Sequence, residues 1–199
     1  MTDQLFLSIW LQRHAQAQRL RYFQKLLRFF PFSQREQQPQ STVSVLAIDM
    51  TEPPLLERAM NGPLDLADVE TMLADYKGDD IAYQVESWWD LWQFDEDWHL
   101  QPARVTLSCF GPDFHNGTEQ ETGAQEDLRI DFGVDSHYLP ETGAAGDARM
   151  MESNIKSLLR LVHELESALP VAHRRLQTES GENFADRLQQ ALAAAERRQ

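Results

Sequence analysis

Aspartate and histidine recur together at one fixed spacing, and these are the residue types in this chain that could do chemistry. Three of the six histidines follow an aspartate by two positions, in Asp97-Trp98-His99, Asp113-Phe114-His115 and Asp135-Ser136-His137. Side chains two residues apart in a strand lie on the same face. Carboxylate and imidazole ligands suit zinc or manganese, so each pair could supply two ligands to a metal ion.

The predicted strands allow only two of these three pairs to meet. The alternating runs 104–112 and 127–135 predict adjacent antiparallel strands, which leave the sheet at opposite edges. At about 3.3 Å per residue, His115 and His137 would then lie on the order of 25 Å apart. The candidate metal site therefore consists of Asp97, His99, Asp135 and His137, and it would imply a small metal-dependent enzyme.

A simpler interpretation exists for two of the pairs. They belong to a repeated phrase, F-G-x-D-x-H, at residues 110–115 and 132–137. The phrase could be a turn at a strand exit, in which glycine supplies conformational freedom and aspartate caps a backbone amide.

A second candidate is the tryptophan-rich segment 87–98, which contains four of the five tryptophans, interleaved with carboxylates. In a strand, Trp88, Trp92 and Phe94 share one face, and Trp89 and Leu91 share the other. Such a surface could clamp a cationic peptide through cation–π contacts and ion pairs, or stack on a sugar; the alternative is ordinary core. The candidate binding residues are the aromatic and acidic ones: Trp88, Trp89, Trp92, Asp95, Glu96, Asp97 and Trp98.

The common catalytic motifs are not recognisable in this sequence. A glycine-rich phosphate loop, a serine-centred elbow, a kinase motif set and an H-E-x-x-H helix are all missing. The single cysteine, Cys109, excludes an internal disulfide. It alternates with Val105 and Leu107 on the expected core face, which argues against a nucleophilic role.

The charge of the chain is uneven. The net charge of −14 divides into +4 for residues 1–48, −19 for residues 49–152 and +1 for residues 153–199. The acidic middle disfavours nucleic-acid binding and favours basic partners, metal cations or simply solubility. No segment approaches the roughly 20 apolar residues that span a bilayer, and no secretory signal is evident, so a cytoplasmic protein without membrane contact is expected.

Five segments have strand patterns, at residues 5–11, 42–49, 80–94, 104–112 and 127–135. Helical patterns cover residues 14–30, a short helix capped by Asp65 and ended by Gly78, a helix opening at Met150, and a final helix from about Glu182 to Arg197. The first strand, helix and second strand predict a βαβ unit with parallel strands.

These elements predict an α+β fold with a mixed, mostly antiparallel five-stranded sheet and helices mainly on one face. It resembles an elaborated ferredoxin-like sandwich. Residues 1–140 would form the sheet domain, and residues 141–199 would add C-terminal helices to the same single domain.

The function that these features favour is a non-enzymatic interaction or regulatory protein of the inhibitor or immunity type. Its acidic, tryptophan-rich surface would bind a basic protein or peptide, without a cofactor. Two alternatives stay open. One is the metal-dependent enzyme, and the other is a homo-oligomeric structural domain whose tryptophan patch is a homodimer interface.

Overall fold

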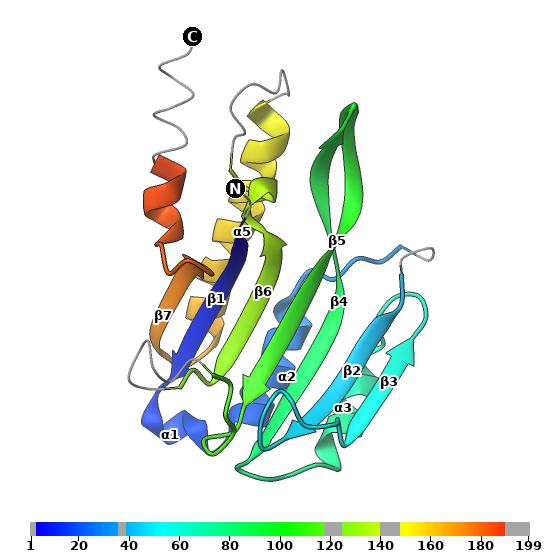
Figure 1. The fold of residues 1–199 in the computed structure, drawn as a ribbon, viewed down its shortest axis with the longest axis vertical. Helices are drawn as coiled ribbons and strands as arrows, with labels where there is room; N and C mark the ends of the chain where they lie inside the picture. Colours follow the sequence, from blue (N-terminus) through cyan, green and yellow to red (C-terminus); the bar gives the residue numbers. More distant parts are fainter. Residues whose placement is uncertain (1–2, 36–38, 118–124, 140–147, 190–199) are drawn as a thin grey trace.

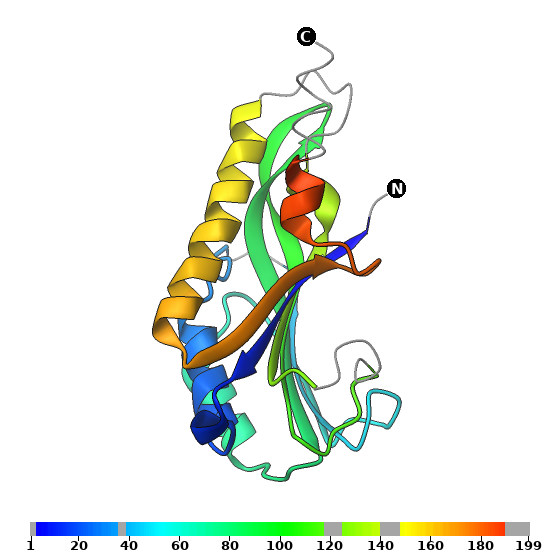
Figure 2. The same cartoon turned by 90° about the vertical axis from the view of Figure 1, so that its left-hand side faces the viewer.

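A computed structural model describes residues 3–35, 39–117, 125–139 and 148–189. The fold is α+β: a seven-stranded antiparallel sheet carries the helices on one of its faces (Figures 1 and 2). The strands are β1 (Gln4–Leu11), β2 (Ser41–Ala47), β3 (Leu56–Met60), β4 (Ile81–Asp95), β5 (Asp97–Phe110), β6 (Leu128–Val134) and β7 (Val171–Thr178). The helices are α1 (Arg13–Gln16), α2 (Arg19–Phe29), α3 (Leu66–Ala74), α5 (Ala148–Ala168) and the 3-10 turn η1 (Asp135–His137).

The sheet has two more strands than the sequence predicts. All five expected strands are present, and the two additional ones, β3 and β7, form the edges of the order β3-β2-β4-β5-β6-β1-β7. Neither strand alternates between apolar and polar residues: β3 (LERAM) has three exposed residues of five, and β7 (VAHRRLQT) has a polar middle. An edge strand has one neighbour and little buried surface, so it need not show the alternation by which strands are recognised. The likeness to a ferredoxin-like sandwich stays a prediction.

The first two strands point in the same direction in one sheet, as the predicted βαβ unit requires. They are not neighbours, because β4, β5 and β6 lie between them. Every pairing between neighbouring strands is antiparallel. The reason is the long crossover: α2 carries the chain across the helical face of the sheet, from β1 to the far side of β4 (Figure 1).

One core fills the space between the sheet and the helices. The strands contribute residues such as Leu7, Val45 and Leu107, and the predicted helical stripe contributes Phe23 and Leu27, all fully buried. The helix expected over residues 14–30 is two helices, α1 and α2.

The caps of the short helix were predicted in part. The Asp65 carboxylate accepts hydrogen bonds from the N–H groups of Ala67 (2.9 Å) and Asp68 (3.3 Å), as expected of an N-cap. The helix ends at Ala74, before the predicted Gly78.

The C-terminal region returns to the sheet. α5 begins at Ala148, two residues before the predicted start, and its chain continues into β7. Helical residues 184–189 follow, and buried Phe184 packs edge-on against Tyr138, with their ring centroids 6.4 Å apart. The remainder of the predicted final helix, residues 190–197, lies outside the described residues. None of the helices within the described ranges is both long and apolar enough to cross a membrane.

Candidate interaction surface on the β4–β5 hairpin

The two longest strands form a hairpin that projects beyond the rest of the sheet (Figure 1). β4 pairs with β2 only as far as Glu86, and β5 pairs with β6 only from Thr106 onward. The β4–β5 pairing continues to Asp95 opposite Asp97, with Glu96 at the tip in a left-handed conformation (φ 62°). Residues 87–105 are therefore a two-stranded ribbon, which is a marginal structure unless other elements support it.

The ribbon has one face in the core and one face turned away from it. Trp89, Leu91 and Ala103 are buried on the helical side of the sheet. The alternate residues make up the opposite side, which we name the outer hairpin face; it consists of Trp88, Asp90, Trp92 and Phe94 on β4, paired with Arg104, Pro102, Leu100 and Trp98 on β5. The predicted division of the tryptophans between two faces agrees with this burial pattern.

Trp89 must be removed from the predicted binding surface. It is only 5% exposed and packs against Phe30, Phe132 and Tyr138, with ring centroids 5.6, 5.9 and 6.5 Å away. Its place on the core face of β4 follows from the same alternation that turns Trp88 outward.

The outer hairpin face exposes apolar surface. Phe94 is 49% exposed and Leu100 is 38% exposed, while Trp92 and Trp98 are half-buried. The Phe94 and Trp98 rings are in contact, with centroids 5.6 Å apart. The sequence prediction omitted Phe94 and Leu100 as binding residues. The signal that could have found them is the register of the hairpin, which sets Phe94 opposite Trp98 and Leu100 opposite Trp92.

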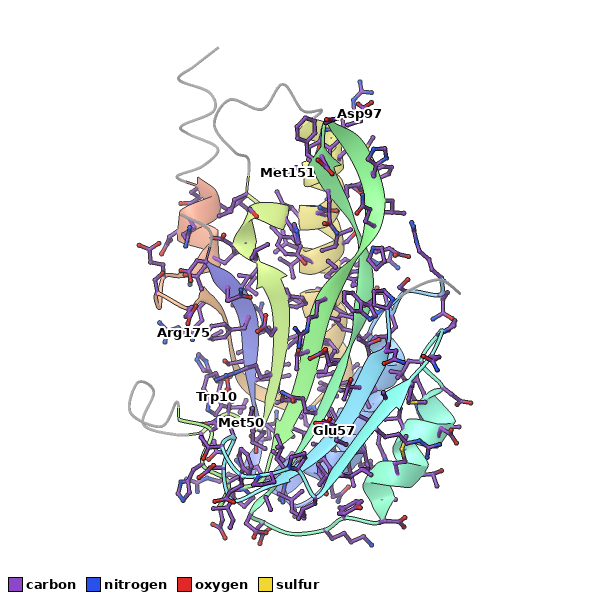
Figure 3. All side chains as sticks on the ribbon, turned by 45° about the vertical axis from the view of Figure 1, so that its right-hand side comes forward. Trp10, Met50, Glu57, Asp97, Met151 and Arg175 are labelled. Atoms are coloured by element: carbon purple, nitrogen blue, oxygen red, sulfur yellow. The ribbon has the colours of Figure 1, made fainter. Side chains whose placement is uncertain are left out.

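The tip adds three consecutive carboxylates, and Figure 3 shows Asp97 at the far end of the hairpin. Asp95, Glu96 and Asp97 are exposed, and none forms an ion pair with another described residue. Asp95 and Asp97 also stand directly opposite each other across the two strands. Like charges in that position destabilise a hairpin, so a bound cation would relieve an unfavourable interaction.

A buried amide fixes the hairpin to the helical layer. The Asn154 side chain, 2% exposed, accepts a hydrogen bond from the Trp92 N–H (3.0 Å) and donates one to the Trp92 carbonyl (2.8 Å). It also donates to the carbonyl of His137 (2.9 Å). Asn154 thereby binds the edge of β4 as a neighbouring strand would, and it joins α5, β4 and η1 at one point.

The four predicted metal ligands are not brought together as a metal site. Asp97 and His99 are exposed near the hairpin tip. The Asp135 carboxylate is buried, forms an ion pair with Arg187 (Oδ2 to Nη2, 2.7 Å) and accepts the N–H of Asp3 (2.9 Å). Across the described part of the chain, no three side chains of His, Cys, Asp or Glu are grouped so that they could hold a metal ion. The metal site stays a prediction from sequence alone.

His137 is only partly exposed. Desolvation lowers the pKa of its imidazole, and Nδ1 is buried without a hydrogen-bond partner. The neutral ring is therefore the favoured form. Cys109 is likewise fully buried, and burial raises the pKa of its thiol far above the ordinary value, which disfavours a nucleophilic thiolate.

The repeated phrase is not a repeated structure. A Cβ atom placed on Gly111 would lie 2.1 Å from the Asp79 carbonyl oxygen, so this glycine permits a close backbone approach. Gly133 instead has a φ of 75°, and its N–H donates to the Asp131 carboxylate (2.8 Å). Among the described residues, the Asp135 carboxylate accepts a backbone N–H, but that of Asp3, 132 residues away, rather than one in the turn. The His115 N–H donates to the Ile48 carbonyl (2.8 Å) at the other end of the sheet.

The fold and this surface define an α+β protein with a large antiparallel sheet, a helical layer and a projecting aromatic hairpin. Comparisons with models of protein families, with curated proteins and with solved structures find no significant match to this chain.

Proposed function

We propose that this protein is a non-enzymatic interaction protein that uses the outer hairpin face and the tip of the β4–β5 hairpin to bind a basic protein or peptide. The observation that carries the proposal is the projection of the hairpin beyond the sheet, with aromatic rings exposed on one face and three unpaired carboxylates at its tip within the described structure.

The chemistry of the surface supports a cationic partner. Exposed aromatic rings surrounded by charge are the arrangement that dominates binding energy in many interfaces. Aromatic faces also attract ammonium and guanidinium groups. The net charge of −14 would draw a basic partner toward the molecule and speed the encounter.

The test is a titration with a defined cationic probe, an octa-arginine peptide, followed by tryptophan fluorescence and calorimetry at two salt concentrations. We expect binding that weakens steeply with salt and that changes the emission of the half-buried Trp92 and Trp98. The triple variant D95N/E96Q/D97N should lose about tenfold in affinity, because it removes the charged rim while keeping the shape of the tip.

The matched control neutralises three exposed carboxylates elsewhere, in E52Q/E57Q/E179Q, with the same change in net charge. It should change the affinity much less than the tip variant. If both triple variants weaken binding equally, the attraction depends only on net charge, and the hairpin is not the binding surface.

A further inference from the structure

Two guanidinium groups of the described chain lie at the outer hairpin face: Arg104 pairs with Glu86, and Arg35 approaches from outside the hairpin. Arg35 lies in the connection between α2 and β2. Its Nε is 3.1 Å from an Asp90 carboxylate oxygen, and its Nη2 donates a hydrogen bond to the Leu100 carbonyl (2.6 Å). The side chain spans both strands of the hairpin and remains partly exposed.

The acceptors around this guanidinium are held in place by buried groups. The Ser33 hydroxyl donates to the Asp90 carboxylate (3.1 Å), and the Ser33 N–H donates to the Trp88 carbonyl (2.7 Å). Ser33 is buried, so its hydroxyl orients the carboxylate without help from the Arg35 side chain. Leu100 lies within β5, opposite Trp92, so the pairing of the two strands restricts its backbone.

The geometry favours a guanidinium over an ammonium group. A planar guanidinium donates in two fixed directions, and here one direction meets a carboxylate and the other a carbonyl. A lysine ammonium is a compact, strongly hydrated charge and would satisfy these two acceptors less well.

We propose that Asp90 and the Leu100 carbonyl form a guanidinium subsite, and that an arginine of the basic partner replaces Arg35 there. This inference rests on the proposed function and specifies it: the partner presents arginine rather than lysine. Displacing Arg35 from Asp90 costs little free energy, since a partly exposed ion pair contributes only about 0–1 kcal/mol. In the free protein Arg35 fills the subsite and competes with the partner.

The experiment compares octa-arginine and octa-lysine peptides on four single variants by calorimetry. R35A should bind octa-arginine about two- to fivefold more tightly than wild type, which corresponds to the loss of one partly exposed ion pair. R35K keeps the charge but not the planar fork, so it should also bind more tightly than wild type. D90N should weaken octa-arginine binding about fivefold and remove the preference for octa-arginine over octa-lysine.

The charge control is R160A, which removes an exposed arginine on α5, paired with Glu164 and remote from the hairpin. If R35A and R160A tighten binding equally and R35K has no effect, the subsite is not used. Unchanged discrimination between the two peptides in D90N would overturn the proposal too. Should the tip variant abolish binding while Arg35 and Asp90 variants do not alter it, the subsite fails and the proposed function stands. If no variant alters binding, both the proposed subsite and the proposed function are wrong.

Discussion

Gly111 and Gly133 hold the same position in a repeated phrase but meet different physical requirements. Gly111 has no space for a side chain, because the Asp79 carbonyl occupies it, whereas Gly133 needs a left-handed backbone. Identical letters therefore do not imply an identical role. The close approach at Gly111 joins the end of β5 to the segment before β4, and its N–H donates to the Ile81 carbonyl (2.8 Å).

Overpacking typically lowers the free energy of unfolding by roughly 1–3 kcal/mol. We expect G111A to reach or exceed the upper end of this range, because backbone atoms must move. The comparison is G117A, at a glycine with φ 80° and open space around it, where only the left-handed strain of about 1–2 kcal/mol applies. Urea unfolding measures both. If the two variants lose the same free energy of unfolding, the backbone around Asp79 accommodates the added methyl group without a penalty.

Glu126 is a second residue whose surroundings decide its behaviour. Its side chain is 2% exposed and forms an ion pair with Arg129. The Arg129 guanidinium lies 5.1 Å from the Phe6 ring centroid and 5.7 Å from that of Phe110. Burial nevertheless outweighs this ion pair and raises the pKa of Glu126 above its ordinary value of 4.5.

The raised pKa has a defined consequence for stability. The folded state binds the proton more tightly than the unfolded state, so this contribution is full at low pH and is lost as pH rises from about 4.5 through the folded pKa. E126Q should flatten this decline in the free energy of unfolding. Burial also raises the pKa values of Asp127 and Asp131, so part of the decline of stability with pH will remain in E126Q. Urea titrations across pH 4–8, with E179Q as the exposed control, provide the test, and an unchanged slope would contradict it.

At the level of elements, the hairpin depends on a helix for its position. The ribbon of residues 87–105 lacks a sheet neighbour on either side over most of its length, and Asn154 of α5 holds its backbone at Trp92. α5 therefore sets the orientation of the surface that we propose for binding.

N154L should release the hairpin. It would leave the Trp92 N–H and the Trp92 and His137 carbonyls without their partner, at a cost of roughly 1–3 kcal/mol per buried unpaired group. Amide hydrogen exchange should then accelerate in residues 91–101 more than in β2, which has a neighbouring strand on both sides. S157A, on an exposed position of the same helix, should change neither. Uniform acceleration over the whole chain would mean that Asn154 supports only global stability.

The sequence predicted those parts of the fold that follow from local rules. Asp65 was recognised as a helix cap, and the alternation around Trp88 and Trp89 divided the tryptophans between two faces without identifying the buried one. It could not supply features set by distant contacts. The edge strand β7 lacks an alternating pattern, and Arg35 meets Leu100 from 65 residues away. The guanidinium subsite that we propose at Asp90 and Leu100 has no signature in any one segment.

Across the whole molecule, one residue joins both ends of the described chain. Arg187 forms ion pairs with Asp3 (3.2 Å) and Asp135 (2.7 Å), so the segment after β7 is held against β1 and η1. The pKa of Asp3 is lowered, first through hydrogen bonding to Ser180, which favours the carboxylate in the folded state. The stabilisation that the ionised Asp3 carboxylate gives the folded state is present above the ordinary pKa of an aspartate. It is lost as pH falls through the lowered pKa of Asp3.

The strand order also bears on how the protein is made. β1 lies between β6 and β7, and its last residue, Leu11, bonds to Asp127 across 116 residues of chain. The pairings among β2, β3, β4 and β5 join segments that are closer in sequence. These four strands can therefore pair before β1 does. Contacts so distant in sequence slow folding, and a chain emerging from the ribosome presents its N-terminus first. We therefore expect β1, which is synthesised before the other six strands of this sheet, to be among the last to join it.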